Sequence, residues 1–238
     1  MKATESTKSA GSTESTPQAP APGPAGEDRR QRKARQTREA LADAAIDLIL
    51  EHGLATVTVE AIAERADVTR RTFSRHFGGK EAAALDFTRA DGDRINAALR
   101  TRPADEPPLA AYRAAVQDWL ADPEMPGWHR RPRTRALLAL VDTEPALFAA
   151  YERVRGDAQD ESVRIIADRL GTGPARDQRP AVIVGAAAGV LTAALRSWAR
   201  GGHADDTDVE DLAAHVEQAY DVLTGEAALA APHIATGN

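Results

Sequence analysis

The segment with the clearest chemical potential is residues 66–81, ADVTRRTFSRHFGGKE. It holds three arginines, whose planar guanidinium groups can bind a guanine edge through two hydrogen bonds or pair with a phosphate. Phe73 and Phe77 stand four residues apart, so a helix would place both rings on one face and most of the arginines off it. The spacing predicts a short helix that buries an aromatic face and exposes a basic one.

Hydroxyl groups and a lysine flank these arginines. Thr69 is the expected N-cap, and hydroxyls beside the positive end of a helix suit phosphate oxygens. Lys80 begins the next helix, where its ammonium group could hold the same strand. The side chains predicted to contact DNA are Thr58, Thr69, Arg70, Arg71, Thr72, Ser74, Arg75, His76 and Lys80.

Two earlier elements must position this helix. Apolar residues recur at helical spacing over residues 37–53, and Gly53 is placed to end that helix. Thr58 is the expected N-cap of a second, short helix, and residues 66–68 form the turn before the third. Two short helices joined by a tight turn predict a helix-turn-helix. The alternative is an ordinary solvated helix with extended arginines, because the pattern alone is weak evidence.

A basic run, RRQRKARQTR, precedes the first predicted helix. Residues 1–28 are rich in Ser, Thr, Pro, Ala and Gly and hold too few large apolar side chains to fold. The basic segment 29–36 is either a solubilising tail or a mobile arm that follows phosphates or enters a minor groove, and its place beside the helix favours the arm. Its basic residues are Arg29, Arg30, Arg32, Lys33 and Arg35.

The charge distribution favours a polyanionic partner at one end of the chain. The 238 residues carry a formal net charge of −6. Residues 29–81 hold 11 Lys and Arg against 8 Asp and Glu, a balance of +3, so the rest hold 19 against 28, a balance of −9. A basic unit on an acidic body is expected when only that unit meets nucleic acid.

The rest of the chain predicts helices and no strand. A fourth helix runs from Lys80 towards Arg100, and further helical periods cover residues 109–120, 135–141, 145–170, 179–200 and 209–223. The fold class is all-α: a three-helix head with a helix-turn-helix over residues 37–84, a helical domain over residues 85–225 and a frayed tail over residues 226–238. The longest apolar run, PAVIVGAAAGVLTAAL, is short for a membrane span, so it is interpreted as a buried helix.

Little in the chain indicates catalysis or a metal. The absence of cysteine excludes disulfides, Cys-ligated zinc and a thiol nucleophile. The six histidines lack metal-ligand spacing, and HADDTD at residues 203–208 is interpreted as a capping loop. The start of the chain lacks the apolar stretch of a secretory signal. We therefore expect no enzyme, no cofactor, no metal and no membrane partner.

The head resembles the DNA-binding domain of TetR-type transcriptional regulators over residues 37–85. The matching steps are GLATVTVEAIA after the first helix, ADVT at residues 66–69 where the family has AGVS, HF at residues 76–77, and GGKE at residues 78–81. The resemblance covers about a fifth of the chain and strongly disfavours the ordinary solvated helix.

The resemblance implies roles for the DNA contacts. It implies that phosphates are held by Thr69, Thr72 and Lys80, and that bases are read in the major groove by Arg70, Arg71 and Arg75. Ser74 stands where many members have Tyr, so a tyrosine contact is missing. Arg71 stands where Gly or Ala is frequent, which indicates a different half-site.

TetR-type proteins form dimers through their last two long helices, and the resemblance implies the same here. Glycines and alanines in VGAAAGVLTAAL would let helices approach closely, although a buried helix within one subunit explains them equally well. The predicted dimer residues are Gly185, Gly189, Leu191, Trp198, Leu212 and Val216. A dimer suits half-sites related by two-fold symmetry.

The middle helices are expected to enclose an effector pocket, although most of its candidates would be core in any helical domain. They are Tyr112, Val116, Trp119, Leu120, Leu137, Leu138, Val141, Leu147, Phe148, Tyr151, Ile165 and Ile166. The layout is loosely similar to the branch of the family that senses acyl-CoA-like ligands. In that case Arg133, Arg135, Arg153 or Arg155 would meet phosphate or carboxylate at the pocket mouth, and surface ion pairs are the alternative.

The sequence thus predicts a cytoplasmic, homodimeric, ligand-responsive regulator, a repressor that a small apolar or amphipathic effector releases from a double-stranded DNA operator. Two other classes stay open. A ligand-independent DNA-binding protein would show weak sequence preference and no effector. A small-molecule-binding protein with a degenerate DNA domain would bind ligand and leave no footprint on DNA.

Overall fold

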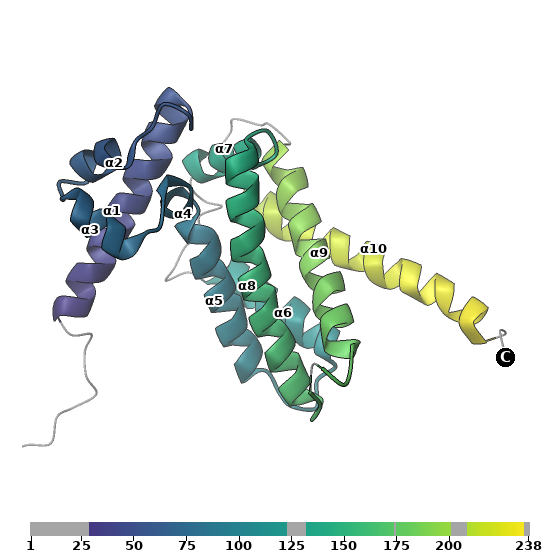
Figure 1. Ribbon diagram of the computed structural model, residues 1–238. Coiled ribbons are helices and arrows are strands. Elements are labelled where there is room, and N and C mark those ends of the chain that lie inside the picture. Colours follow the sequence, from purple (N-terminus) through teal and green to yellow (C-terminus); the bar gives the residue numbers. More distant parts are fainter. Residues whose placement is uncertain (1–28, 123–131, 174, 201–208, 236–238) are drawn as a thin grey trace, which may run out of the picture.

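The computed structural model describes residues 29–122, 132–173, 175–200 and 209–235, and all of the regular structure in these ranges is helical (Figure 1). This confirms the all-α fold class. The predicted tail at residues 1–28 and the capping loop at residues 203–208 lie outside the described residues.

The head consists of four helices packed on one small core. They are α1 (Arg29–His52), α2 (Val59–Arg65), α3 (Arg70–His76) and α4 (Lys80–Ala84). Phe73 is 1% exposed and its ring lies 5.7 Å from the ring of Phe77, so the predicted aromatic face of α3 is buried. Ile62 of α2 and Leu41 of α1 are buried in the same core. The head thus fixes the orientation of α3 through side chains that are four residues apart in the sequence.

Local hydrogen bonds and turns begin and end these short helices. The Thr58 hydroxyl accepts from the Ala61 amide at 3.1 Å, and the Thr69 hydroxyl accepts from the Thr72 amide at 3.2 Å, as expected of N-caps. Gly53 ends α1 with a φ of 79°. Asp67, in the turn between α2 and α3, has a φ of 52°, a left-handed conformation that side chains other than glycine adopt at a cost.

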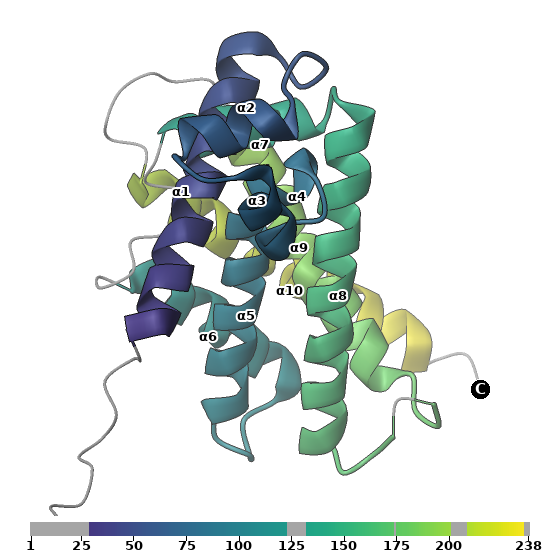
Figure 2. The ribbon, with the colours of Figure 1, turned by 60° about the vertical axis from the view of Figure 1, so that its left-hand side comes forward.

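In its described residues the body contains six helices, and the central one is α9. They are α5 (Asp86–Thr101), α6 (Pro108–Ala121), α7 (Pro132–Val141), α8 (Pro145–Arg169), α9 (Arg179–Arg200) and α10 (Val209–Ala235). α9 packs against α6, α7, α8 and α10, and α5 lies beside α8 in both ribbon views (Figures 1 and 2).

Three predicted boundaries differ from the structure. The expected helix from Lys80 to Arg100 is broken at Leu85, a fully buried residue whose side chain anchors the break in the core. The last helix continues to Ala235, so residues 226–235 are helical where a frayed tail was expected. The first helix begins at Arg29 and includes the basic segment.

The apolar helix α9 passes a length and composition test for a membrane span, but it is the core helix of the body. Nine of its side chains are buried within the protomer, among them Val184, Ala187 and Trp198. A helix that buries its face against four others has no need of lipid. The prediction of a buried helix for this run is confirmed.

Candidate DNA-binding surface and effector cavity

The outer face of α3 presents cationic and hydroxyl side chains to solvent. Arg71, Ser74 and Arg75 are exposed, and within the described part of the chain neither arginine has an acidic partner. Arg70 is exposed as well, but its guanidinium lies 2.9 Å from the Glu60 carboxylate. Reading a base with Arg70 would require that ion pair to open, whereas Arg71 and Arg75 are available as they stand.

Two of the predicted DNA contacts, Lys80 and His76, make contacts within the head. The Lys80 ammonium donates to the Leu54 carbonyl at 2.6 Å and to the Val57 carbonyl at 2.9 Å, so it ties down the α1–α2 loop. His76 is half-buried and its Nε2 is shielded from solvent. Burial, with Arg38 and Arg75 nearby, lowers the pKa of His76. Lys80 and His76 thus make contacts within the head, and their DNA contacts stay predictions.

Thr58, Thr69 and Thr72 remain beside the surface. Thr58 and Thr69 are exposed, Thr72 is half-buried, and the hydroxyl oxygens of Thr69 and Thr72 lie 3.1 Å apart. The caps occupy one lone pair of Thr58 and of Thr69, so each oxygen keeps further hydrogen-bonding capacity for a phosphate. Their predicted role stays open to test.

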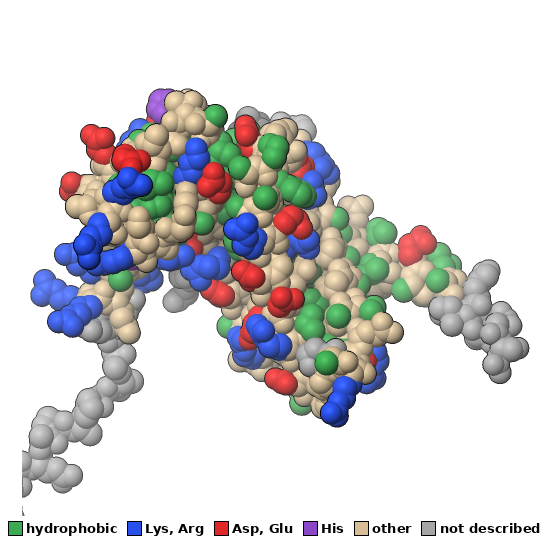
Figure 3. Space-filling model, viewed as in Figure 1, with side chains coloured by type: hydrophobic (Ala, Val, Ile, Leu, Met, Phe, Trp, Pro, Cys, Tyr) green, Lys and Arg blue, Asp and Glu red, His purple; other side chains and the backbone are tan. Residues whose placement is uncertain are grey.

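The basic segment is the first two turns of α1 rather than a flexible arm. Arg29, Arg30, Arg32, Lys33 and Arg35 are all exposed on the helix, and Arg35 lies 3.5 Å from Glu39. Figure 3 shows Lys and Arg side chains gathered where α1 begins and α3 lies. The structure thus places residues 29–36 in a basic helix end, where a mobile arm was expected.

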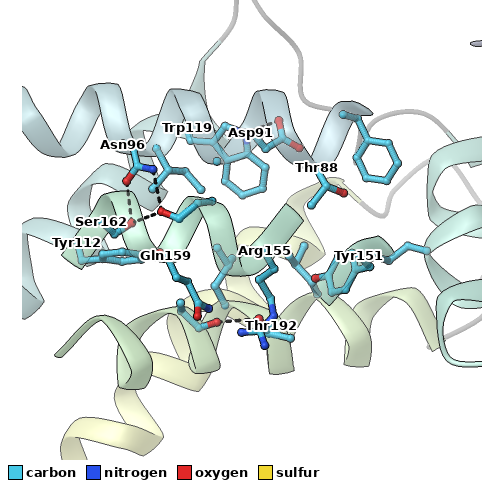
Figure 4. Close-up of a pocket in the computed structure, with 18 residues that line it drawn as sticks. Thr88, Asp91, Asn96, Tyr112, Trp119, Tyr151, Arg155, Gln159, Ser162 and Thr192 are labelled. Carbon is cyan, nitrogen blue, oxygen red and sulfur yellow. Dashed lines mark hydrogen bonds between the residues drawn. The ribbon is translucent and has the colours of Figure 1, made fainter. Parts of the chain in front are cut away.

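A cavity lies in the body, lined by residues of α5, α6, α7, α8 and α9 (Figure 4). The chain has four Phe, three Trp and three Tyr, and four of these ten side chains line it: Phe87, Tyr112, Trp119 and Tyr151. The helices α5 and α8 approach so closely beside it that a Cβ on Gly92 would meet the Ala158 Cβ at 2.8 Å.

The predicted pocket residues divide into lining and core. Tyr112, Trp119, Tyr151 and Leu138 line the cavity. Others are buried in the core but do not line it: Val116, Leu137, Val141, Leu147, Ile165 and Ile166. Leu120 is half-buried and does not line it either. Phe148 is 40% exposed and lies under the Arg196 guanidinium, so its assignment to the pocket is wrong.

The sequence reading missed the contribution of α5, which supplies Phe87, Thr88 and Asp91 among others. The signal was present: Phe87, Asp91 and Ile95 recur every four residues on one helix face, and Asp91 interrupts an otherwise apolar stripe. A carboxyl in a buried stripe is a candidate for a site.

Polar side chains in the cavity wall form two groups. The Asn96 amide donates to the Ala158 carbonyl at 3.0 Å, and the Ser162 hydroxyl donates to Asn96 Oδ1 at 2.7 Å. Asp91 Oδ1 accepts from Trp119 Nε1 at 3.0 Å and from Arg94. Burial raises the pKa of Asp91 to about 7, against the opposing effect of Arg94.

The four arginines proposed for the pocket mouth have different places. Arg133 pairs with Asp47 of α1, and Arg135 donates to the Trp198 carbonyl at 2.9 Å. Arg153 is exposed. Arg155 lines the cavity and pairs with Glu152, its Nε lying 3.2 Å from Glu152 Oε1. Ion pairs thus account for two of the four, Arg133 and Arg155.

The predicted dimer residues also separate. Gly185 and Gly189 lie on the exposed face of α9. Leu191 lines the cavity, Trp198 is 2% exposed, and Leu212 and Val216 are buried within the protomer. These four are already covered by their own chain, so their assignment to a dimer interface is corrected; the sequence pattern cannot tell a helix packed inside a subunit from one packed between subunits.

Comparison with known proteins agrees with the division into a DNA-binding head and a helical body. Residues 41–84 match the family described as bacterial regulatory proteins, tetR family, and residues 106–228 match the MftR C-terminal domain. The chain is 38% identical over 193 residues to the HTH-type transcriptional regulator TcmR of Streptomyces glaucescens, covering 80% of this chain and 84% of that protein. It is 27% identical over 171 residues to MftR of Mycobacterium tuberculosis, covering 69% and 80%.

The fold has solved counterparts. The fatty acid degradation regulator FadR of Bacillus halodurans superimposes with a TM-score of 0.51 at 16% identity, over 79% of this chain and 95% of that one. At this identity the likeness concerns the fold alone. The matched families are regulatory and not enzymatic. With a helix-turn-helix head and a matching body, the chain belongs to the TetR family of DNA-binding transcriptional regulators and carries an MftR-type C-terminal domain.

Proposed function

We propose that this regulator is a homodimeric repressor that binds a palindromic operator and leaves it when a small apolar or amphipathic effector enters the cavity. The observation that carries the DNA-binding part is the exposed face of α3, where Arg71 and Arg75 stand without acidic partners in the described chain. Each arginine that reads a guanine contributes about 1–3 kcal/mol of discrimination. A regulator of bacterial transcription acts at the chromosome, which places it in the cytoplasm.

A groove between α9 and α10 supports the dimer. It is lined by small and apolar residues, among them Gly189, Ala193, Ala219 and Val222, and Val222 is 61% exposed. Small residues let two helices approach closely, and an exposed apolar face of this kind is covered in assemblies. The face is adjacent to, and distinct from, the buried residues first predicted.

An ion pair connects the first helix of the body to the end of the recognition helix α3. Arg38 of α1 donates to both carboxylate oxygens of Asp86, at 2.8 and 2.6 Å, and to the His76 carbonyl at the end of α3, at 3.0 Å. Asp86 is the first residue of α5, and Phe87 and Thr88, which follow it, line the cavity. A ligand that moves the first turn of α5 therefore shifts the support of the recognition helix.

The test is selection of bound sequences from random double-stranded DNA with the full chain. We expect a palindrome whose half-sites lie about one helical turn apart. The elution volume of the unaltered protein on a sizing column should correspond to a dimer. Val222→Glu places a charge in the exposed groove, so this variant should elute as a monomer and bind the operator more weakly. Recovery of unrelated sequences, or a monomeric unaltered protein, would refute the proposal.

A further inference from the structure

The polar groups of the cavity specify more than an apolar ligand. We propose that the effector is a neutral, largely apolar ring compound whose hydroxyl group donates a hydrogen bond to Asp91 Oδ2. This rests on the proposed function, because it takes the body cavity as the effector site.

Asp91 is a buried carboxyl with one oxygen unused. The residue is 5% exposed and lines the cavity. Its Oδ1 accepts from Trp119 and Arg94, while its Oδ2 is shielded from solvent and has no hydrogen-bond partner among the described residues. Burial raises the pKa of Asp91 to about 7, so above that pH Oδ2 is a charged acceptor buried without a donor. Such an oxygen is costly, and a ligand that supplies a donor recovers that energy.

The charge around Asp91 favours a neutral donor. Arg94 pairs with the carboxylate, so the local charges already balance. A ligand ammonium would bring a second cation beside Arg94, and a ligand carboxylate would face the Asp91 oxygen. The guanidinium of Arg155, on the opposite side of the cavity in Figure 4, is paired with Glu152 and is not left over for an anionic ligand. A hydroxyl donates its proton without adding charge.

Two further polar atoms in the cavity wall are buried without a hydrogen-bond partner among the described residues. Within the described chain, Thr88 Oγ1 and Gln159 Nε2 are both buried without a hydrogen bond, and both residues line the cavity. Thr88 precedes Asp91 by three residues on α5, so the two side chains share a helix face, as Figure 4 shows. A ligand hydroxyl that donates to Asp91 could therefore accept from Thr88, which uses both capacities of one O–H group.

The rest of the wall suits rings. Phe87, Tyr112, Trp119 and Tyr151 supply flat apolar surfaces, and aromatic pairs gain beyond the burial of area alone. The other polar pair, Asn96 with Ser162, is satisfied internally. Among the described lining residues, the unmet hydrogen bonds are thus those of Asp91 Oδ2, which needs a donor, and of Thr88 Oγ1 and Gln159 Nε2, which can donate.

The test compares 2-naphthol with 2-methylnaphthalene, which differ by a hydroxyl in place of a methyl, and with 2-naphthoate. Titration calorimetry on the full chain should show 2-naphthol binding about tenfold or more tightly than the methyl compound, with 2-naphthoate weakest. Asp91→Leu should abolish this preference while still binding 2-methylnaphthalene, which shows that the cavity is intact. Thr88→Val should reduce the preference, and Asp93→Asn, an exposed aspartate on the same helix, should leave it unchanged.

Equal affinities for the hydroxyl and methyl compounds, tighter binding of the naphthoate, or no binding of any probe would overturn the proposal. So would a hydroxyl preference that survives Asp91→Leu in a folded protein; should that variant not fold, an unchanged preference in Thr88→Val would do the same. These titrations need no DNA. A protein that fails to select a palindrome but still prefers naphthol refutes the proposed function and leaves this inference standing.

Discussion

The head and the body use their polar side chains in opposite directions. In the head the core is filled by Phe73, Phe77 and their neighbours, and Arg71 and Arg75 point outward to solvent. In the body Asp91 and Thr88 lie at an interior cavity, and both keep an atom without a partner in the described chain. The head therefore presents its polar side chains to an external partner, whereas the body has buried polar atoms whose hydrogen bonds a ligand in the cavity would complete.

The two regions meet through apolar and charged contacts. Helix α1 packs against α7 and α4 packs against α8, and the buried side chains of head and body form one apolar cluster. Arg38 joins α1 to Asp86 of α5, and Arg133 of α7 joins Asp47 of α1. Ion pairs can change partners with smaller rearrangements than a packed core can. Ion pairs between the head and the helices around the cavity suit a switch, and four substitutions test the difference between the two regions.

The largest effect is expected where the head is most tightly filled. Phe73→Ala should lower the free energy of unfolding by about 3–5 kcal/mol, because it leaves a hole in a core that has no spare space. Phe148→Ala removes the same ring from an exposed site of the body and should cost less than about 1 kcal/mol. Chemical denaturation measures both; equal losses would contradict the burial described here.

The next effect concerns the pH dependence of stability that the buried Asp91 carboxyl produces. The pKa of Asp91 is raised to about 7, so the folded state holds this proton more tightly than the unfolded chain. Stability is then lost as the pH rises from about 4 to about 7, and no more is lost above that range. The charged or titratable side chains facing Asp91 are Arg94 on its own helix and, across the cavity, Tyr112, Tyr151 and Arg155.

Asp91→Asn removes this titration. Relative to the unaltered protein, the variant should gain stability between pH 4 and pH 7, by about 2–4 kcal/mol, and the difference should be flat above pH 7. Thermal unfolding across this pH range measures it. The exposed Asp93→Asn should show no such trend, and a similar trend in both variants would contradict the assignment to Asp91.

A smaller effect tests the outward surface of the head. Arg71→Ala should weaken operator binding by about 1–3 kcal/mol and relax selectivity at one base position, because one bidentate contact is lost. Arg153→Ala, an exposed arginine of the body, should leave binding unchanged. Competition binding with single-base operator variants measures the effect; if affinity falls equally on every sequence, Arg71 contacts phosphate instead.

The smallest effect has the opposite sign. Asp67 stands where the family has glycine, and its φ is 52°. Asp67→Gly removes the left-handed strain but adds freedom to the unfolded chain, so we expect a net gain in stability of at most about 1 kcal/mol. Chemical denaturation would show this gain as a higher midpoint concentration of denaturant, with the slope of the unfolding free energy against denaturant unchanged. A loss of more than about 1 kcal/mol would mean that the Asp67 side chain supports the turn.

The contrast also explains what could be predicted from the sequence. The caps at Thr58 and Thr69, the end at Gly53 and the apolar stripes are local patterns, so the helices of the head followed directly. The break at Leu85 did not, because it depends on packing with α1.

The cavity required three-dimensional information. Its shape depends on the approach of α5 to α8 at Gly92, two helices that lie far apart in the sequence. Tyr112 and Val116 have the same helical period, yet only Tyr112 lines the cavity. Trp198 and Leu212 looked suited to a dimer because a buried apolar stripe has the same pattern whether its cover is the same chain or another.

The most direct measurement of the central claim is operator affinity with and without a ligand in the cavity. The full chain is titrated onto its selected palindrome in the presence of 2-naphthol at a concentration that saturates the cavity by calorimetry. A ligand that biases the head through α5 should weaken operator binding about 5- to 150-fold, equivalent to a coupling of about 1–3 kcal/mol. Unchanged operator affinity with a saturated cavity would contradict the account.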